Sequence, residues 1–214
     1  MSTANYQEFG FLSSGAGNGE SGVGLAETFL QQVATLENVK RICDLGCGNG
    51  YISGLLASRG YEVVGIDASQ SGTSIARERY PGAQFICSLI DETMNERLRL
   101  EQFDLVVSSD VIEHMYRPSD LVVAAASMLK PGGELLLGTP YHGYWKNLAL
   151  AVSGKLDSHF NVLDDGGHIK FFSVKTLSQL VIRHSFTDLK FTYYGRAPWL
   201  WMNMLCYARK AERP

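Results

Sequence analysis

The chain has 214 residues, of which 45% are hydrophobic and 19% are charged, and its formal net charge is −3. This length supports one sizeable hydrophobic core, and the apolar content excludes a disordered chain. Proteins that bind duplex DNA or long RNA usually carry a basic surplus, so the acidic balance argues against that class. Because the N-terminus lacks the pattern of a secretory signal and there is no long apolar run, we expect a cytoplasmic protein without a transmembrane segment.

The cysteines lie at positions 43, 47, 87 and 206, and none forms a C-x-x-C pair. Cys43 and Cys87 fall in apolar runs typical of strands. A disulfide framework is not expected at this length and cysteine density. We therefore predict buried free thiols in a reducing compartment.

The chain begins with a segment rich in Gly and Ser (13–24), which we expect to be mobile, followed by an amphipathic helix over 25–36. From residue 39, β-branched runs alternate with helical patterns. Strands are predicted at 39–45, 61–67, 83–87, 103–110 and 134–140, and helices at 51–60, 69–80 and 119–130. A turn is predicted at 131–133, an irregular aromatic segment at 141–172, a helix at 172–185, and an antiparallel pair of strands at 189–195 and 200–210.

The alternation of strands and helices predicts a parallel sheet with helices on both faces. The fold class is a single, doubly wound α/β domain over 37–214, with a hairpin at one edge of the sheet. Two segments remain outside this pattern. We expect 1–36 to be an N-terminal cap or mobile segment, and 141–172 to be an insertion that caps the substrate site.

A glycine loop separates the first predicted strand from its helix. Asp44 precedes this loop, which has the sequence Gly46-Cys-Gly-Asn-Gly50, and Asp67 ends the next strand about twenty residues later. Glycines allow a tight turn close to a ligand, and a carboxylate at the second position can bind both ribose hydroxyls. Asp44 would repel a pyrophosphate but suits an ammonium group, which favours S-adenosylmethionine over a dinucleotide. The alternative is that Asp67 caps the following helix and Asp44 caps the loop backbone.

The segments ICDLGCGNGYIS, VVGIDAS, FDLVVSSDVIEH and LKPGGELLLGTP occur in this order. They resemble the successive motifs of class I S-adenosylmethionine-dependent methyltransferases over residues 39–140. The resemblance implies a Rossmann-like sheet of seven strands with the last strand antiparallel, and S-adenosylhomocysteine as the spent cofactor. It also implies these cofactor-binding residues: Asp44, Gly46, Cys47, Gly48, Asp67, Ala68, Ser88, Leu89, Ile90 and Ser109.

Within the third motif, SDVIEH resembles the metal-binding E-x-x-E-H of ubiquinone-biosynthesis O-methyltransferases. The later HIKFFS segment of this chain also resembles that type of enzyme. SDVIEH also resembles the metal site of small-RNA 2′-O-methyltransferases, although Asp stands here where Glu is expected. Carboxylates and imidazoles suit Mg²⁺, Mn²⁺ or Zn²⁺, so the candidate metal ligands are Asp110, Glu113, His114 and His168. Two alternatives stay open. Either the stretch only shapes the loop, or His114, His142 or His168 serves as a general base.

These observations predict an enzyme that transfers a methyl group from S-adenosylmethionine to a small molecule, most readily to a hydroxyl oxygen, with a divalent metal as an optional cofactor. The alternatives are an RNA-terminal 2′-O-methyltransferase and a non-catalytic module that binds S-adenosylmethionine. Tyr141, Tyr144 and Trp145 either line the acceptor pocket or seal the cap onto the sheet. We expect a monomer or homodimer, without nucleic acid as partner, and with peripheral membrane contact through the 147–156 segment as an option.

Overall fold

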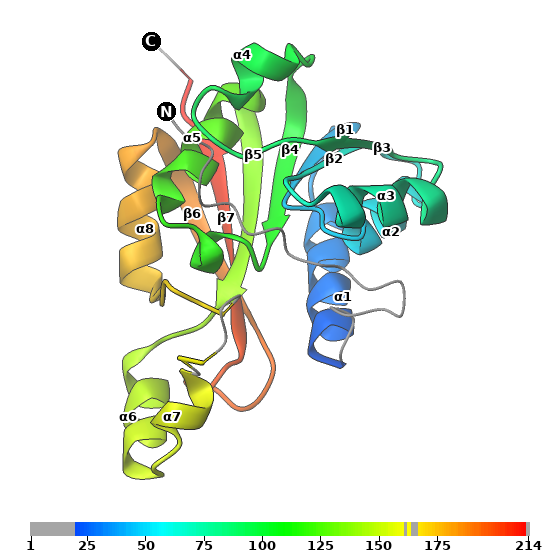
Figure 1. The fold of residues 1–214 in the computed structure, drawn as a ribbon. Coiled ribbons are helices and arrows are strands. Elements are labelled where there is room, and N and C mark those ends of the chain that lie inside the picture. The colour runs from blue at the N-terminus through cyan, green and yellow to red at the C-terminus, as the bar shows by residue number, and fades with distance from the viewer. Residues whose placement is uncertain (1–19, 161, 164–166, 213–214) are drawn as a thin grey trace.

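The computed structural model describes residues 20–160, 162–163 and 167–212, and is built on one seven-stranded sheet (Figure 1). The strand order is β3-β2-β1-β4-β5-β7-β6. The first five strands in chain order are parallel, and β7 runs antiparallel to both β5 and β6. The strands are β1 (Arg41–Leu45), β2 (Glu62–Asp67), β3 (Gln84–Cys87), β4 (Phe103–Ser109), β5 (Leu129–Pro140), β6 (Phe186–Tyr194) and β7 (Asn203–Lys210). The predicted sheet, its terminal hairpin and its antiparallel last strand are confirmed.

Helices cover both faces of the sheet, as the doubly wound architecture predicts (Figure 1). One face carries α1 (Glu20–Ala34), α2 (Tyr51–Ala57) and α3 (Gln70–Arg79). The other face carries α4 (Met94–Leu98), α5 (Pro118–Met128) and α8 (Val174–Arg183). Leu121 of α5 and Leu177 and Val181 of α8 are buried in the core on this face. The parallel strands are apolar on both sides because both faces are covered.

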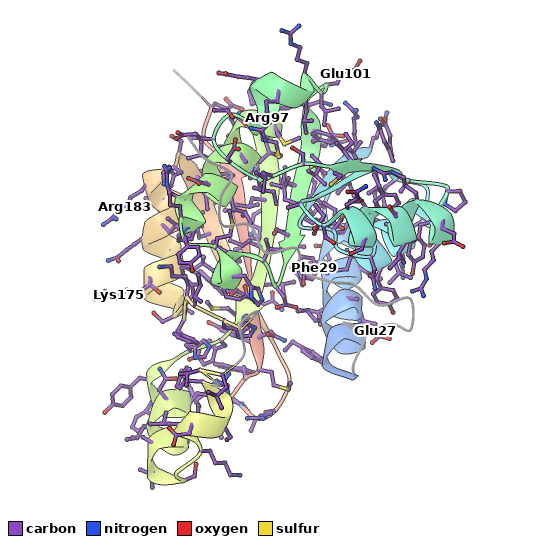
Figure 2. The ribbon with its side chains drawn as sticks, in the orientation of Figure 1. Glu27, Phe29, Arg97, Glu101, Lys175 and Arg183 are labelled. Atoms are coloured by element: carbon purple, nitrogen blue, oxygen red, sulfur yellow. The ribbon has the colours of Figure 1, made fainter. Side chains whose placement is uncertain are left out.

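Helix α1 lies against the face of the sheet. Phe29 points from α1 toward the strands while Glu27 faces solvent (Figure 2), and Leu25 and Phe29 are almost completely buried. The Phe29 ring lies 2.7 Å from the position that a Cβ would take at Gly138 of β5, so the glycine gives the ring its space. Residues 20–24 of the Gly/Ser-rich segment are the start of this helix, whereas 13–19 lie outside the described residues. The described part of the 1–36 segment therefore belongs to the helical layer.

The segment predicted to be irregular, 141–172, contains two helices, α6 (Tyr144–Val152) and α7 (Leu156–His159). Both lie beyond the carboxyl end of β5, away from the other helices (Figure 1). The prediction of irregular structure is wrong for these residues, because the many aromatic side chains and glycines around α6 obscured its short apolar pattern. The Nζ atom of Lys146 donates to the Tyr141 carbonyl at 2.7 Å and to the Met202 carbonyl at 3.4 Å, which ties α6 to β5 and to the segment before β7.

Three further expectations need correction. Strand β5 begins at Leu129, and Pro131–Gly133 form an irregularity within the strand, because the pairing with β4 jumps from Leu129 to Glu134. Helix α4 and the 3₁₀ turn η1 (Ile112–His114) were not expected, since each is too short to give a periodic pattern. All four cysteines are free as predicted, but Cys87 is exposed because it lies at the end of the edge strand β3.

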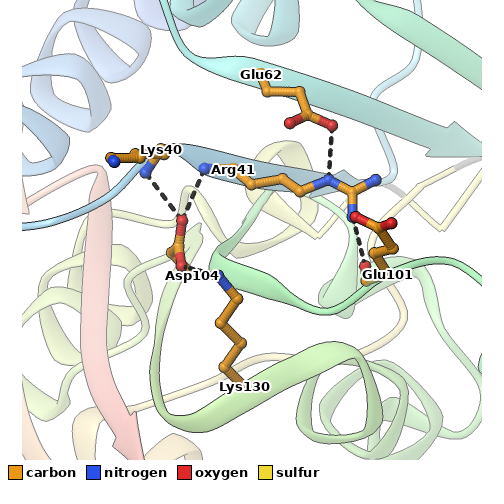
Figure 3. A network of polar contacts seen from close by, with 6 residues as sticks. All are labelled: Lys40, Arg41, Glu62, Glu101, Asp104 and Lys130. Carbon is orange, nitrogen blue, oxygen red and sulfur yellow. Dashed lines mark hydrogen bonds and ion pairs between the residues drawn. The ribbon is translucent and has the colours of Figure 1, made fainter.

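A polar network fixes the amino ends of β1, β2 and β4 (Figure 3). The Asp104 Oδ2 atom accepts from the backbone N–H groups of Lys40 and Arg41 at 2.9 and 2.8 Å, and its Oδ1 atom lies 2.6 Å from the Lys130 Nζ atom. The Arg41 guanidinium binds Glu62 at 2.7 Å and the Glu101 carbonyl at 2.9 Å. Burial alone would raise the pKa of Asp104, but the hydrogen bonds from Lys130 and the two backbone groups outweigh it and lower the pKa.

We expect Asp104→Asn to lower the free energy of unfolding by about 2 kcal/mol, since it removes charge-assisted hydrogen bonds at a largely buried site. A carboxylate with a lowered folded-state pKa stabilises the protein above its unfolded pKa of about 3.9 and loses this effect as the pH falls through the folded value. The variant should therefore differ most from the wild type in denaturant titrations near neutral pH and least in acid. The control is Glu101→Ala, because the Glu101 side chain is 92% exposed. This substitution should lower the free energy of unfolding by less than about 1 kcal/mol. Equal losses in both variants would contradict this account of the network.

Candidate functional site at the carboxyl edge of the sheet

The loop between β1 and α2 is held in a conformation that requires glycine. Gly46, Gly48 and Gly50 have φ values of 81°, 52° and 78°, in the left-handed region that other residues rarely adopt. At Gly46, a Cβ would lie 2.2 Å from the Val111 Cγ2 atom, which belongs to the segment after β4. The backbone N–H groups of Gly46 and Cys47 both donate to the Ile66 carbonyl of β2, at 2.7 and 3.1 Å. The loop is thereby fixed against two neighbouring strands.

Asp67 lies at the carboxyl end of β2 and faces this loop. Its Oδ2 atom accepts from the Gly48 N–H at 2.8 Å, and its Oδ1 atom accepts from the Ser69 N–H at 2.7 Å. Ser69 in turn caps α3, because its side chain accepts from the Gly72 N–H. Burial raises the pKa of Asp67, and the hydrogen bonds from Ser69 and Gly48 limit this effect. Each carboxylate oxygen has more than one lone pair, so these bonds leave acceptor capacity on both oxygens.

Asp44 is the next-to-last residue of β1, just before the loop, and is 2% exposed. The Ser53 Oγ atom of α2 donates to its Oδ2 atom at 2.6 Å. Burial raises the pKa of Asp44 to about 6, the negative charge of Asp67 adds to this effect, and the hydrogen bonds from Ser53 oppose it. The two carboxylates are thus close enough to repel one another, and this part of the site favours a cationic group.

The segment after β3 is organised by Arg97 of α4. The Arg97 guanidinium binds both oxygens of Asp91 at 2.8 Å and donates to the Leu89 carbonyl at 2.8 Å and to the Ser88 Oγ atom at 3.3 Å. The Ser88 N–H donates to the Asp67 carbonyl at 2.9 Å, which places Ser88 directly beside the end of β2. Ala68 follows Asp67 in the same turn, and its carbonyl accepts from the Cys87 thiol at 3.6 Å. Ala68 and Ser88 therefore lie next to Asp67, with Leu89 and Ile90 following in the chain, and Ile90 packs against the core.

Strand β4 ends at Ser109, and the chain turns there into η1. Asp110 has a φ of 54°, a left-handed conformation that aspartate tolerates better than most residues. The Ser109 Oγ atom lies 3.3 Å from the Asp110 Oδ2 atom. Glu113 is 1% exposed, and burial, followed by the charge of Asp110, raises the pKa of its carboxyl group.

Three of the four predicted metal ligands come together. One ligand atom from each of Glu113, His114 and His168 lies within 4.8 Å of the others. The Glu113 Oε1 atom is buried without a hydrogen-bond partner among the described residues, and it lies 3.9 Å from the His168 Nε2 atom. A buried carboxylate oxygen in this state fits a site for a divalent cation, and one carboxylate with two imidazoles is a suitable ligand set. Asp110 is not one of the three, although its charge raises the pKa of Glu113 and the two carboxyl groups share a hydrogen bond.

His142, the remaining candidate base, lies apart from this group. It is 5% exposed and its ring packs against His159, Phe160 and Phe171 beneath α6 and α7. Burial, together with the charge of Lys146, lowers the pKa of His142 to about 4. A base with so low a pKa is poorly matched to proton abstraction at neutral pH. Of the aromatic residues in this segment, Tyr141 is buried in the core, while Tyr144 and Trp145 are 72% and 57% exposed.

The sequence did not single out Ser53, Val111 or Thr139. Ser53 binds Asp44, Val111 fits against Gly46, and the Thr139 Oγ1 atom donates to the Glu113 Oε2 atom at 2.9 Å. Ser53 lies nine positions after Asp44, and a search of the first turns of α2 for a hydroxyl could have found it. Val111 and Thr139 gave no signal, because their contacts join residues from separate strand ends.

A family model described as a methyltransferase domain matches residues 23–190 of the chain. The ubiquinone biosynthesis O-methyltransferase of Azoarcus sp. is 34% identical over 144 residues, which cover 65% of this chain and 61% of that protein. The enzyme of the same name from Hydrogenovibrio crunogenus is 32% identical over 142 residues, covering 65% and 58% of the two chains. The chain therefore matches about three fifths of the length of these curated relatives.

The solved structures with a similar fold are more distant in sequence. A SAM-dependent methyltransferase from Archaeoglobus fulgidus aligns with a TM-score of 0.67 at 15% identity, covering 87% of this chain and 93% of that one. The N-methyltransferase NodS from Bradyrhizobium japonicum, in complex with S-adenosyl-L-homocysteine, aligns with a TM-score of 0.64 at 16% identity, covering 91% and 90%. These likenesses support the Rossmann-like fold. Within the part of the chain that the structure describes, no helix combines the length and apolar character needed to cross a membrane.

The Gly46–Val111 contact leads to a test of the loop. Gly46→Ala should lower the free energy of unfolding by about 1–2 kcal/mol for the left-handed backbone, and by a further 1–3 kcal/mol for the collision with Val111. Gly60→Ala is the matched control, because Gly60 has a φ of 92° and a Cβ there would have no neighbour within 4 Å. Urea titration of both variants measures the difference. Similar losses at the two positions would show that the contact with Val111 is not tight.

Proposed function

Because the chain belongs to the family of the methyltransferase domain, we propose that it transfers a methyl group from S-adenosylmethionine to a hydroxyl oxygen of a small molecule. The observation that carries this proposal is the arrangement of Asp44 and Asp67 around the glycine loop. A pair of mutually repelling carboxylates is suited to a ligand that carries positive charge and a ribose diol. S-adenosylmethionine has a cationic ammonium and sulfonium at one end and a ribose in its middle, whereas a dinucleotide would bring an anionic pyrophosphate to the same loop.

In this proposal each part of the cofactor has its own group of residues. The methionine part packs on the backbone of Gly46, Cys47 and Gly48, with Asp44 supplying negative charge beneath it. Asp67 binds the ribose hydroxyls, and Ala68 contacts the adenosine. The segment Ser88-Leu89-Ile90 flanks the adenine, which is supported by the anchoring of this segment to Asp67 and Arg97. Ser109, at the end of β4, lies beneath the reactive methyl group.

The hydroxyl acceptor is supported by the names of the curated relatives and by the ligand set of Glu113, His114 and His168. These three residues would hold a divalent cation next to the cofactor loop, since Val111 contacts Gly46 and directly precedes η1. A bound divalent cation would hold a vicinal diol and lower the pKa of one hydroxyl. In this proposal Asp110 is not a ligand and acts on Glu113 through its charge and the hydrogen bond between the two carboxyl groups.

Methyl transfer from a sulfonium is an in-line displacement with a neutral leaving group. The main task of the protein is therefore to align the two reactants and exclude water, which can contribute about 7–11 kcal/mol. A hydroxyl acceptor must also lose its proton. An imidazole that binds the cation cannot also accept this proton, so His114 and His168 are candidate bases only in the absence of a cation. His142 is disfavoured in either case, because its pKa is about 4 and it lies among aromatic rings.

The remaining predictions on partners belong to the proposal as well. Tyr144, Trp145 and Val152 expose apolar surface on α6, which favours peripheral contact with a membrane by a protein whose acceptor has an apolar tail. The net charge of −3 argues against an RNA terminus as acceptor. A module that binds the cofactor without catalysis would have no use for the grouping of Glu113, His114 and His168.

The assignment of Asp67 predicts a loss of cofactor affinity. Asp67→Ala should weaken the binding of S-adenosylhomocysteine by about 1–3 kcal/mol, the scale of charge-assisted hydrogen bonds, as measured by isothermal titration calorimetry. Asp188→Ala, on the remote strand β6, should leave the dissociation constant unchanged. A normal dissociation constant in the Asp67→Ala protein would show that the ribose is bound elsewhere.

The activity itself is tested with a small catechol, its ortho-amino analogue and a short RNA as acceptors. Mass spectrometry should detect a methyl group on the catechol oxygen, in an amount equal to the S-adenosylhomocysteine formed. A chelator should suppress the transfer, as should Glu113→Ala. Cofactor binding without transfer to any acceptor would identify a binding module instead, and full activity in both the chelator and the Glu113→Ala experiments would remove the metal from the proposal.

A further inference from the structure

Thr139 is a buried hydroxyl residue on the central strand β5, close to its carboxyl end. It is completely shielded from solvent, and its backbone is fixed on one side by pairing with Met204 of β7. Its Oγ1 atom donates a hydrogen bond of 2.9 Å to the Glu113 Oε2 atom. Strand β5 therefore reaches the cluster of Glu113, His114 and His168 through the Thr139 side chain.

This hydrogen bond fixes the orientation of the Glu113 carboxylate. A carboxylate can rotate about its terminal bond, and a buried oxygen without a partner is unfavourable. With Oε2 bound to Thr139, the other oxygen, Oε1, is directed to the side of His168, where its distance to the Nε2 atom is 3.9 Å. The structure thus has Oε2 of Glu113 held by Thr139, while Oε1 is buried and faces His168.

The backbone of Glu113 fixes the segment that carries His168. Its carbonyl accepts from the N–H groups of both Ile169 and Lys170, each at 2.9 Å. The His114 Nδ1 atom lies 3.2 Å from the Gly167 carbonyl, so the residues on both sides of His168 are bound to η1. The His114 and His168 rings meet edge to face with centroids 4.8 Å apart.

From these contacts we infer that Thr139 is a positioning residue for a divalent-cation site: it orients Glu113 so that Oε1 faces the same point as the imidazoles of His114 and His168. Thr139 does not itself touch the cation or the substrate. The inference rests on the proposed function, because it assumes that the three residues bind a cation. Hydrogen bonds to a ligating carboxylate restrict its orientation, and their removal typically weakens metal binding by about 10–100-fold.

The test is calorimetric titration of the full chain with Zn²⁺ and, separately, with Mn²⁺. Thr139→Val keeps the shape of the side chain but removes the donor, and should raise the cation dissociation constant at least about tenfold. Thr139→Ser keeps the hydroxyl and should restore the affinity to within about threefold of the wild type. The matched control is Thr73→Val, since the buried Thr73 hydroxyl donates to the Ser69 carbonyl and has no part in the cluster.

The binding of S-adenosylhomocysteine is measured on the same proteins and should not change, which shows that the fold is intact. Wild-type affinity for the cation in Thr139→Val would overturn the inference and leave the proposed methyl transfer standing. An absence of cation binding in the wild type would overturn it as well. A failure of the proposed function would appear differently, as a wild-type protein that binds no S-adenosylhomocysteine or forms no methylated product.

Discussion

The close approach of Gly46 to Val111 is the contact on which the site depends. It joins the loop after β1 to the segment after β4, and a side chain at position 46 would push the two apart. Because η1 begins directly after Val111, the same contact sets the distance between the glycine loop and Glu113. The parallel sheet brings these strand ends to one edge, and the missing Cβ allows them to meet.

This edge of the sheet concentrates acidic side chains. Asp44, Asp67, Asp110 and Glu113 all follow or end strands here, and each has a pKa raised mainly by loss of solvent. Buried carboxylates destabilise a folded chain unless hydrogen bonds or an opposite charge offset the loss of solvent. At the opposite edge, Asp104 is bound to Lys130 and to two backbone N–H groups, and its pKa is lowered. The contrast indicates that the amino edge serves stability, whereas the carboxyl edge is where we propose that cationic ligands bind.

Much of the fold could be predicted because the parallel strands are local features. Runs such as 61–67 carry β-branched residues and end in a polar group, and the helices between them show clear spacing. The closeness of the glycine loop to Asp67 could be predicted for the same reason, since a single βαβ unit contains both. The bond from Thr139 to Glu113 could not be found, because it spans 26 residues and depends on strand order. Helices α6 and α7 were missed because they are short, and Cys87 was misjudged because only the topology shows that β3 is an edge strand.

Helices α6 and α7 are joined to the sheet at a narrow junction, made by Tyr141, His142 and the Lys146 side chain. None of the strand pairings in the sheet involves residues of α6 or α7. Evolution could therefore lengthen, shorten or replace this segment without disturbing the strands that hold the glycine loop. Divergence among such proteins is then expected to be fastest in these two helices.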